Sequence, residues 1–192
     1  MPFTNIKGLI TAVIFLLFII SPYPDIVLGD DALLTDISVG TGSEYLEVDF
    51  TVKNCFTEDM REAIDNGITT SFTFLIKLER KRTLWWDEKI SDFKVSHQVQ
   101  YDNLKKVYNV KRSEHNDEVV SVKDFKEAER LMSRIQDLKV TRLRKLEKGE
   151  KYQIHMMAEL DMIRLPLYLH YVFFFLSLWD FETDWYTVEF RY

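Results

Sequence analysis

The residues best suited to chemistry lie near the C-terminus, where acidic and aromatic side chains alternate. Asp180, Glu182 and Asp184 are separated by single residues, like the first three ligands of a calcium-binding loop. A calcium site is nevertheless not predicted, because Trp185 stands where that loop needs glycine and no bidentate glutamate follows at the required distance.

The aromatic residues of the same block favour a different chemistry. Trp179, Trp185 and Tyr186 would offer flat surfaces on which a sugar or another small ligand stacks, with the neighbouring carboxylates accepting hydrogen bonds. The structural alternative is a strand that buries the aromatic residues and exposes the acids. Both interpretations stay open at this point.

Two further tryptophans stand between expected strands, in the segment Leu84-Trp85-Trp86-Asp87. Basic residues precede this segment and recur later in the chain, and the simplest interpretation is a solvated rim. If both basic clusters lay at one end of the domain, they would dock an acidic partner. We expect at least one of the two tryptophans to cover the edge of the core. The candidate partner-contact or ligand-contact residues are therefore Trp85, Trp86, Trp179, Asp180, Glu182, Asp184, Trp185 and Tyr186.

The residues needed for most enzymatic and metal chemistry are scattered. The four histidines, at positions 97, 115, 155 and 170, form no close pair, so a zinc site is not expected. The single cysteine, Cys55, is expected to be an inert, partly buried thiol. No Gly-rich phosphate loop or nucleophile elbow is present. No catalytic, cofactor-binding or metal residue is predicted, although a hydrolase that combines His155 with Asp180 or Glu182 is a third-ranked alternative.

The N-terminal residues predict export. A lysine at position 7 precedes an apolar run from Gly8 to Ile20, and small or modest residues before Asp30 suit signal peptidase. We therefore expect residues 1–29 to be a signal peptide and residues 30–192 to form one periplasmic domain, without a transmembrane segment after cleavage. If the segment is not cleaved, it would tether the domain to the inner membrane. The net charge of −6 argues against nucleic-acid binding.

The elements that must position these side chains are mostly strands. Apolar residues alternate with period two in residues 45–52, 71–79, 94–101 and 152–160, and more weakly in 30–39, 106–111, 139–144 and 185–191. Thr57 is expected to cap a helix that ends at Gly67. A second helix is expected from Ser121 to about Gln136, with Ser121 and Asp124 as a capping pair.

This pattern predicts a mainly β protein, an antiparallel β-sandwich with an immunoglobulin-like appearance and two short inserted helices. The alternative is an α+β fold in which one sheet is backed by both helices.

The order of several short motifs resembles a known family. The motifs begin with Phe56-Thr57, Glu62-Ala63-Ile64 and Asn66-Gly67-Ile68, continue through Tyr101-Asp102, and end with Leu165-Pro166, Trp179-Asp180-Phe181 and Trp185-Tyr186. In this order and spacing they are similar to the bacterial exported proteins of domain-of-unknown-function family 4390. The resemblance implies a signal peptide followed by one small cell-envelope domain. It also suggests envelope sensing beside a sensor kinase, and it transfers no catalytic residue.

Together these observations favour a non-enzymatic protein-interaction module in the periplasm. Its partner would be an unidentified envelope protein, membrane-bound in one version of the hypothesis, and no cofactor is expected. The alternative is a small-ligand or glycan binder that uses the C-terminal aromatic block.

Overall fold

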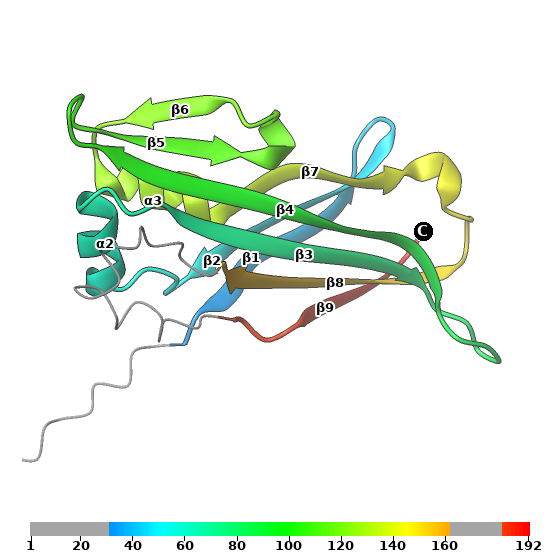
Figure 1. Cartoon of the computed structure of the whole chain (residues 1–192). Helices are drawn as coiled ribbons and strands as arrows, with labels where there is room; N and C mark the ends of the chain where they lie inside the picture. The colour runs from blue at the N-terminus through cyan, green and yellow to red at the C-terminus, as the bar shows by residue number, and fades with distance from the viewer. Residues whose placement is uncertain (1–30, 162–181) are drawn as a thin grey trace, which may run out of the picture. The chain divides into compact units, whose positions relative to one another are not determined.

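A computed structural model describes residues 31–161 and 182–192 of the chain (Figure 1). The expected signal peptide, Trp179 and Asp180 lie outside these residues. Strands predominate, as the period-two patterns predict. The strands are β1 (Leu33–Thr41), β2 (Tyr45–Lys53), β3 (Thr70–Arg80), β4 (Glu88–Asp102), β5 (Val107–Arg112), β6 (Val119–Val122), β7 (Arg134–Arg142), β8 (Lys151–Leu160) and β9 (Tyr186–Arg191). The helical elements are α2 (Glu58–Asp65), α3 (Phe125–Ser133) and the short 3₁₀ turns η1 (Ser113–His115) and η2 (Leu143–Lys145).

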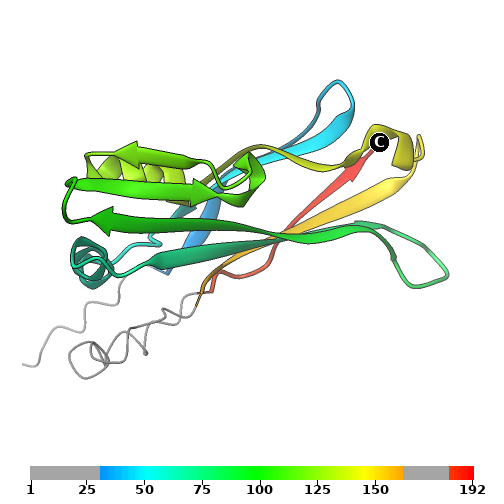
Figure 2. The ribbon, with the colours of Figure 1, turned by 45° about the horizontal axis from the view of Figure 1, so that its top comes forward.

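The described strands form two antiparallel sheets. One sheet has three strands in the order β1-β2-β7, and the other has six in the order β6-β5-β4-β3-β8-β9. Figure 2 shows the long β3 and β4 strands crossing the whole length of the larger sheet, with β5 and β6 beside only one half of β4. The mainly β class with two helices is therefore confirmed.

The alternative of a single sheet backed by both helices is wrong, because β1, β2 and β7 pair with one another and form a second sheet. A constant-type immunoglobulin domain divides its strands four and three. The division observed here is different, and the immunoglobulin-like appearance is not confirmed.

The core lies between the two sheets and follows the predicted alternation. In β2 every second residue is buried, and the same holds for the inward face of β8 from Tyr152 to Leu160. The Phe50 ring of β2 meets the Phe74 ring of β3 edge to face, with 5.8 Å between centroids. Because these two strands belong to different sheets, this contact joins the inner faces of the sheets.

Helix α2 forms where the sequence predicts it. The Thr57 side chain accepts a hydrogen bond from the Met60 N–H, and Glu58 and Asp59 occupy the first turn, where they complement the helix dipole. Gly67 follows the helix with a φ of +86°, a conformation that glycine adopts without strain.

Helix α3 is shorter than expected, and its capping residue is different. Asp124, not Ser121, is the N-cap, and its Oδ1 accepts a hydrogen bond from the Lys126 N–H at 3.0 Å. Ser121 belongs to β6, because the β-branched residues around it pair with β5. The helix ends at Ser133 because the next residue, Arg134, pairs with β2.

Among the residues that the structure describes, no helix is long and apolar enough to cross a membrane.

Candidate functional site

Three consecutive, highly exposed apolar residues form the turn between β3 and β4. Leu84 is 87% exposed, Trp85 76% and Trp86 92%. Such side chains are normally buried at least in part, so three in a row on one turn is unusual. We call these three residues the hairpin tip. Figures 1 and 2 both show this hairpin extending past the end of β8.

The expectation that Trp85 or Trp86 covers the edge of the core is wrong. The β3–β4 ladder continues as far as the pair Arg80 and Glu88, and this pairing carries the turn beyond the end of the sheet. Neither tryptophan can reach the core from that position. Their exposure leaves them free to contact a partner.

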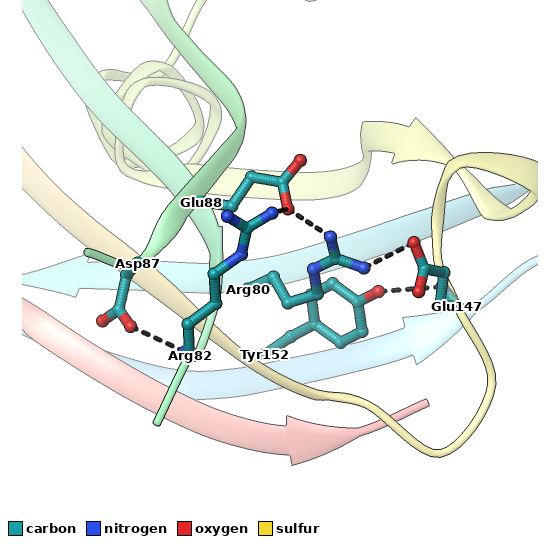
Figure 3. A network of polar contacts seen from close by, with 6 residues as sticks. All are labelled: Arg80, Arg82, Asp87, Glu88, Glu147 and Tyr152. Atoms are coloured by element: carbon teal, nitrogen blue, oxygen red, sulfur yellow. Dashed lines mark hydrogen bonds and ion pairs between the residues drawn. The ribbon is translucent and has the colours of Figure 1, made fainter. Parts of the chain in front are cut away.

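Charged and polar side chains hold the base of the hairpin (Figure 3). Arg80 makes ion pairs with Glu88 of β4 and with Glu147, which lies between η2 and β8. Arg82 also pairs with Glu88. The Glu147 N–H donates a 2.8 Å hydrogen bond to the hydroxyl of Tyr152, whose side chain is fully buried. The hairpin base is thereby connected to the core.

A second set of contacts closes the turn itself. The Asp87 carboxylate accepts hydrogen bonds from the Arg82 N–H at 3.0 Å and from the Gln153 side chain at 3.1 Å. Lys81 lies 3.2 Å from the same carboxylate. The hydrogen bond from the Arg82 N–H, followed by that from Lys81, outweighs partial desolvation and lowers the pKa of Asp87. Asp87 therefore stays ionised at neutral pH and keeps the base of the turn closed.

The C-terminal candidates that the structure describes lie beside or on β9 of the same sheet, away from the tip. Glu182 forms an isolated bridge with Glu159, and Asp184 is exposed. Trp185 and Tyr186 are 42% and 46% exposed. Tyr186 pairs with Met156 of β8, four residues from Tyr152 at the base of the hairpin, or about 13 Å along the strand. The structure thus separates the two groups of aromatic residues.

The Trp185 ring already has a partner on one face. The Lys77 ammonium group lies 4.4 Å from the ring centroid, in a cation–π contact. A sugar stacking on that face would have to displace the lysine.

The combination of His155 with Glu182 is not brought together. His155 Nδ1 lies 2.8 Å from the Thr187 hydroxyl, and its Nε2 lies 3.5 Å from the Glu79 carboxylate. Glu182 instead pairs opposite Glu159, four residues farther along β8. Asp180 lies outside the described residues. The carboxylate beside His155 is therefore Glu79 of β3, which the sequence spacing did not indicate.

The sequence predicts neither a metal site nor a reactive cysteine. Within residues 31–161 and 182–192, no three histidine, cysteine or acidic side chains are grouped so that they could hold a metal ion. Cys55 is 3% exposed, and burial together with the charge of Glu129 raises the pKa of its thiol to about 12. This cysteine therefore stays protonated and unreactive at neutral pH.

A buried polar pair that sequence patterns missed joins β4 of the larger sheet to η1. His97 is fully buried, with Nδ1 2.9 Å from the Met132 carbonyl oxygen and Nε2 2.9 Å from Glu114 Oε1. Burial alone would raise the pKa of Glu114, but the hydrogen bond and charge of His97 outweigh burial and lower it.

This pair predicts a dependence of stability on pH. Because folding lowers the pKa of Glu114, the pair contributes stability above the ordinary value of about 4.5, and this contribution is lost as the pH falls below it. We expect Glu114→Gln to be less stable than the wild type at about pH 7 and to approach it at about pH 3. Urea unfolding of both proteins at each pH measures the difference, and a gap that is unchanged at low pH would contradict this role.

Comparison with known proteins identifies one family. A family profile described as "Domain of unknown function (DUF4390)" matches residues 29–189, which is most of the chain. No curated protein and no solved structure matches the chain.

Proposed function

We propose that this chain, which belongs to the DUF4390 family, is a non-enzymatic protein-interaction module of the cell envelope. Its main contact would be the hairpin tip. The observation that carries the proposal is the exposure of Leu84, Trp85 and Trp86, between 76% and 92%. Burying one tryptophan removes about 150–250 Å² from water, so a partner that covers the tip gains several kcal/mol.

The base of the hairpin supports the same proposal. Arg80 holds Glu88 and Glu147 together, so the tip is presented on a braced support and loses less conformational entropy on binding. Tryptophan is also enriched among the residues that dominate binding energy. The charged residues around the base, including Lys81 and Asp87, would form the polar rim of such an interface.

The N-terminal sequence supports a periplasmic location. Residues 1–29 have the composition of a signal peptide, and the alternative is an inner-membrane tether through Gly8 to Ile20. In either case the partner would be another envelope protein, and a membrane-bound sensor kinase fits this setting. The proposed function does not depend on an immunoglobulin-like arrangement of the strands.

A small-ligand or glycan site at Trp185 and Tyr186 is less well supported. Both rings are partly exposed, but Lys77 covers one face of Trp185. The hairpin tip has no such covering contact among the described residues.

Affinity capture from envelope extracts tests the proposal. The bait proteins are the wild type, a Trp85→Ser/Trp86→Ser variant and a Leu104→Ser control, whose leucine is 96% exposed at the other end of β4. We expect one envelope protein to be retained by the wild type and the control but not by the double variant. Equal retention by all three baits would rule out the tip as the contact.

A further inference from the structure

β4 of the larger sheet and β7 of the smaller sheet do not pair with each other, and we call the boundary between them the seam. At one end of the seam the Ser91 hydroxyl donates a 3.0 Å hydrogen bond to the Val140 carbonyl oxygen. At the other end the His97 ring lies 2.9 Å from the Met132 carbonyl oxygen, just before β7. These contacts are six residues apart on β4, or about 20 Å of extended chain. A crevice of about 830 Å³ lies along this stretch.

One wall of the crevice is an unpaired strand edge. β5 pairs with β4 only from Asp102 back to His97, although β4 begins at Glu88. The next N–H along this side, that of Ser96, donates to the Ser113 hydroxyl at 2.9 Å. Because alternate residues of a strand direct their N–H and C=O groups to the same side, those of Lys94 and Asp92 also point there. Among the described strands, none pairs with this side of β4 before Ser96.

The opposite wall is also a strand edge. β7 pairs with β2, and no described strand pairs with its other side. Residues 136–139 of β7 line the crevice opposite residues 93–95 of β4. Phe93 is partly buried, and Val95 and Leu138 are buried, so these three side chains form an apolar strip between the edges. Charged side chains, namely Lys94, Arg112, Asp137 and Lys139, also line the crevice. An apolar strip flanked by unpaired backbone groups has the features that accept an added strand.

Glu114 adds a requirement for a hydrogen-bond donor. Its side chain lines the crevice and is 9% exposed. His97 occupies Oε1, whereas the buried Oε2 has no hydrogen-bond partner among the described residues. An unsatisfied buried carboxylate oxygen is costly, and a cationic donor satisfies it best.

We propose that this crevice binds an extended peptide segment of a partner protein. The segment pairs as a strand with the open edge of β4, in line with β5, whose pairing with β4 ends at Arg112. It carries a lysine or arginine side chain toward Glu114. This surface is separate from the hairpin tip, so the inference does not depend on the function proposed for the tip. A second copy of the chain fits less well, because two β4 edges pairing about a two-fold axis near Lys94 would bring like charges together.

A synthetic peptide tests this inference directly. The probe is an acetylated and amidated peptide of alternating valine and threonine with a central lysine, about six residues long to match the crevice. The control probe has the same sequence with alternate backbone nitrogens methylated, which removes the donors of one strand edge. We expect the unmodified peptide to bind saturably and to slow hydrogen exchange at the Asp92 and Lys94 N–H groups. We expect the methylated peptide to bind at least about tenfold more weakly.

Two protein variants form a matched pair. Lys94→Pro removes an N–H that points away from β3, so the β3–β4 ladder is kept and only the open edge is lost. Lys94→Ala keeps the N–H. We expect the proline variant to lose binding about tenfold and the alanine variant to keep it. If the proline variant does not fold, the difference in binding of the two peptides to the wild-type protein still tests whether the peptide pairs with the open edge of β4.

Several results would overturn the inference. These are no binding of the unmodified peptide, equal binding of the methylated peptide, or protection at amides outside the crevice. If sedimentation shows that the wild-type protein is a dimer and that the Lys94→Pro variant is a monomer, the occupant of the crevice is a second copy of the chain instead. The Trp85→Ser/Trp86→Ser variant should bind the peptide normally. A failure of the proposal for the hairpin tip can therefore be distinguished from a failure of the proposal for the crevice.

Discussion

Replacing Trp85 and Trp86 together by serine is expected to weaken binding of the captured envelope partner by roughly several hundredfold or more, without lowering the melting temperature. Two tryptophans at the centre of an interface each contribute about 2 kcal/mol or more to such binding, and about 1.4 kcal/mol corresponds to a tenfold change. Because both side chains are at least 76% exposed, they contribute little to folding, and surface changes of this kind alter stability by about 0.5 kcal/mol or less.

Titration calorimetry with the purified partner measures the affinity, and thermal unfolding measures the stability. Leu104→Ser is the control, since Leu104 has the same apolar character and 96% exposure but lies at the opposite end of β4. An affinity loss of equal size in the control would mean that general surface hydrophobicity, not the hairpin tip, governs binding.

Phe74→Ala is expected to destabilise the folded domain by about 3–5 kcal/mol. Phe74 is fully buried, with its ring centroid 5.8 Å from that of Phe50 in the other sheet and 4.8 Å from the His97 ring. Truncation to alanine leaves a cavity between the sheets that the surrounding side chains can fill only in part. The loss is a large share of the roughly 5–15 kcal/mol that holds a typical domain folded.

Leu75→Ala is the matched control for this prediction. Leu75 follows Phe74 on β3 but points to the opposite face of the sheet, where it is only half-buried. Urea unfolding of both variants gives the comparison. If Leu75→Ala costs as much as Phe74→Ala, the main core does not lie between the two sheets.

Local sequence patterns predicted the strands with one buried face well. In β2 the alternation of apolar residues matches burial residue by residue, because the strand has one face on the core. In β8 the predicted inward residues are all buried, but Gln153 and Met157 on the other face are buried as well. β6 was missed, since its four residues show too little alternation and its existence depends on pairing with β5. The same pairing explains the wrong start of α3: Ser121 and Asp124 are both good N-caps, and only the tertiary partner decides between them.

The candidate site was only partly predictable for a similar reason. The sequence placed Trp85 and Trp86 between two strands, but their exposure depends on how far the β3–β4 ladder extends and on Glu147, which is distant in sequence. The open edge of β4 likewise results from a difference in length between paired strands. Such differences arise from register and are not encoded in any single segment.

The most direct test of the proposed function is site-specific photo-crosslinking in intact cells. A photoreactive amino acid replaces Trp86 in one protein and Leu104 in another, both highly exposed positions at opposite ends of β4. We expect position 86, and not position 104, to crosslink to one discrete envelope protein. Crosslinking at position 104 alone, or the same pattern at both positions, would contradict the assignment of the hairpin tip as the partner-binding surface.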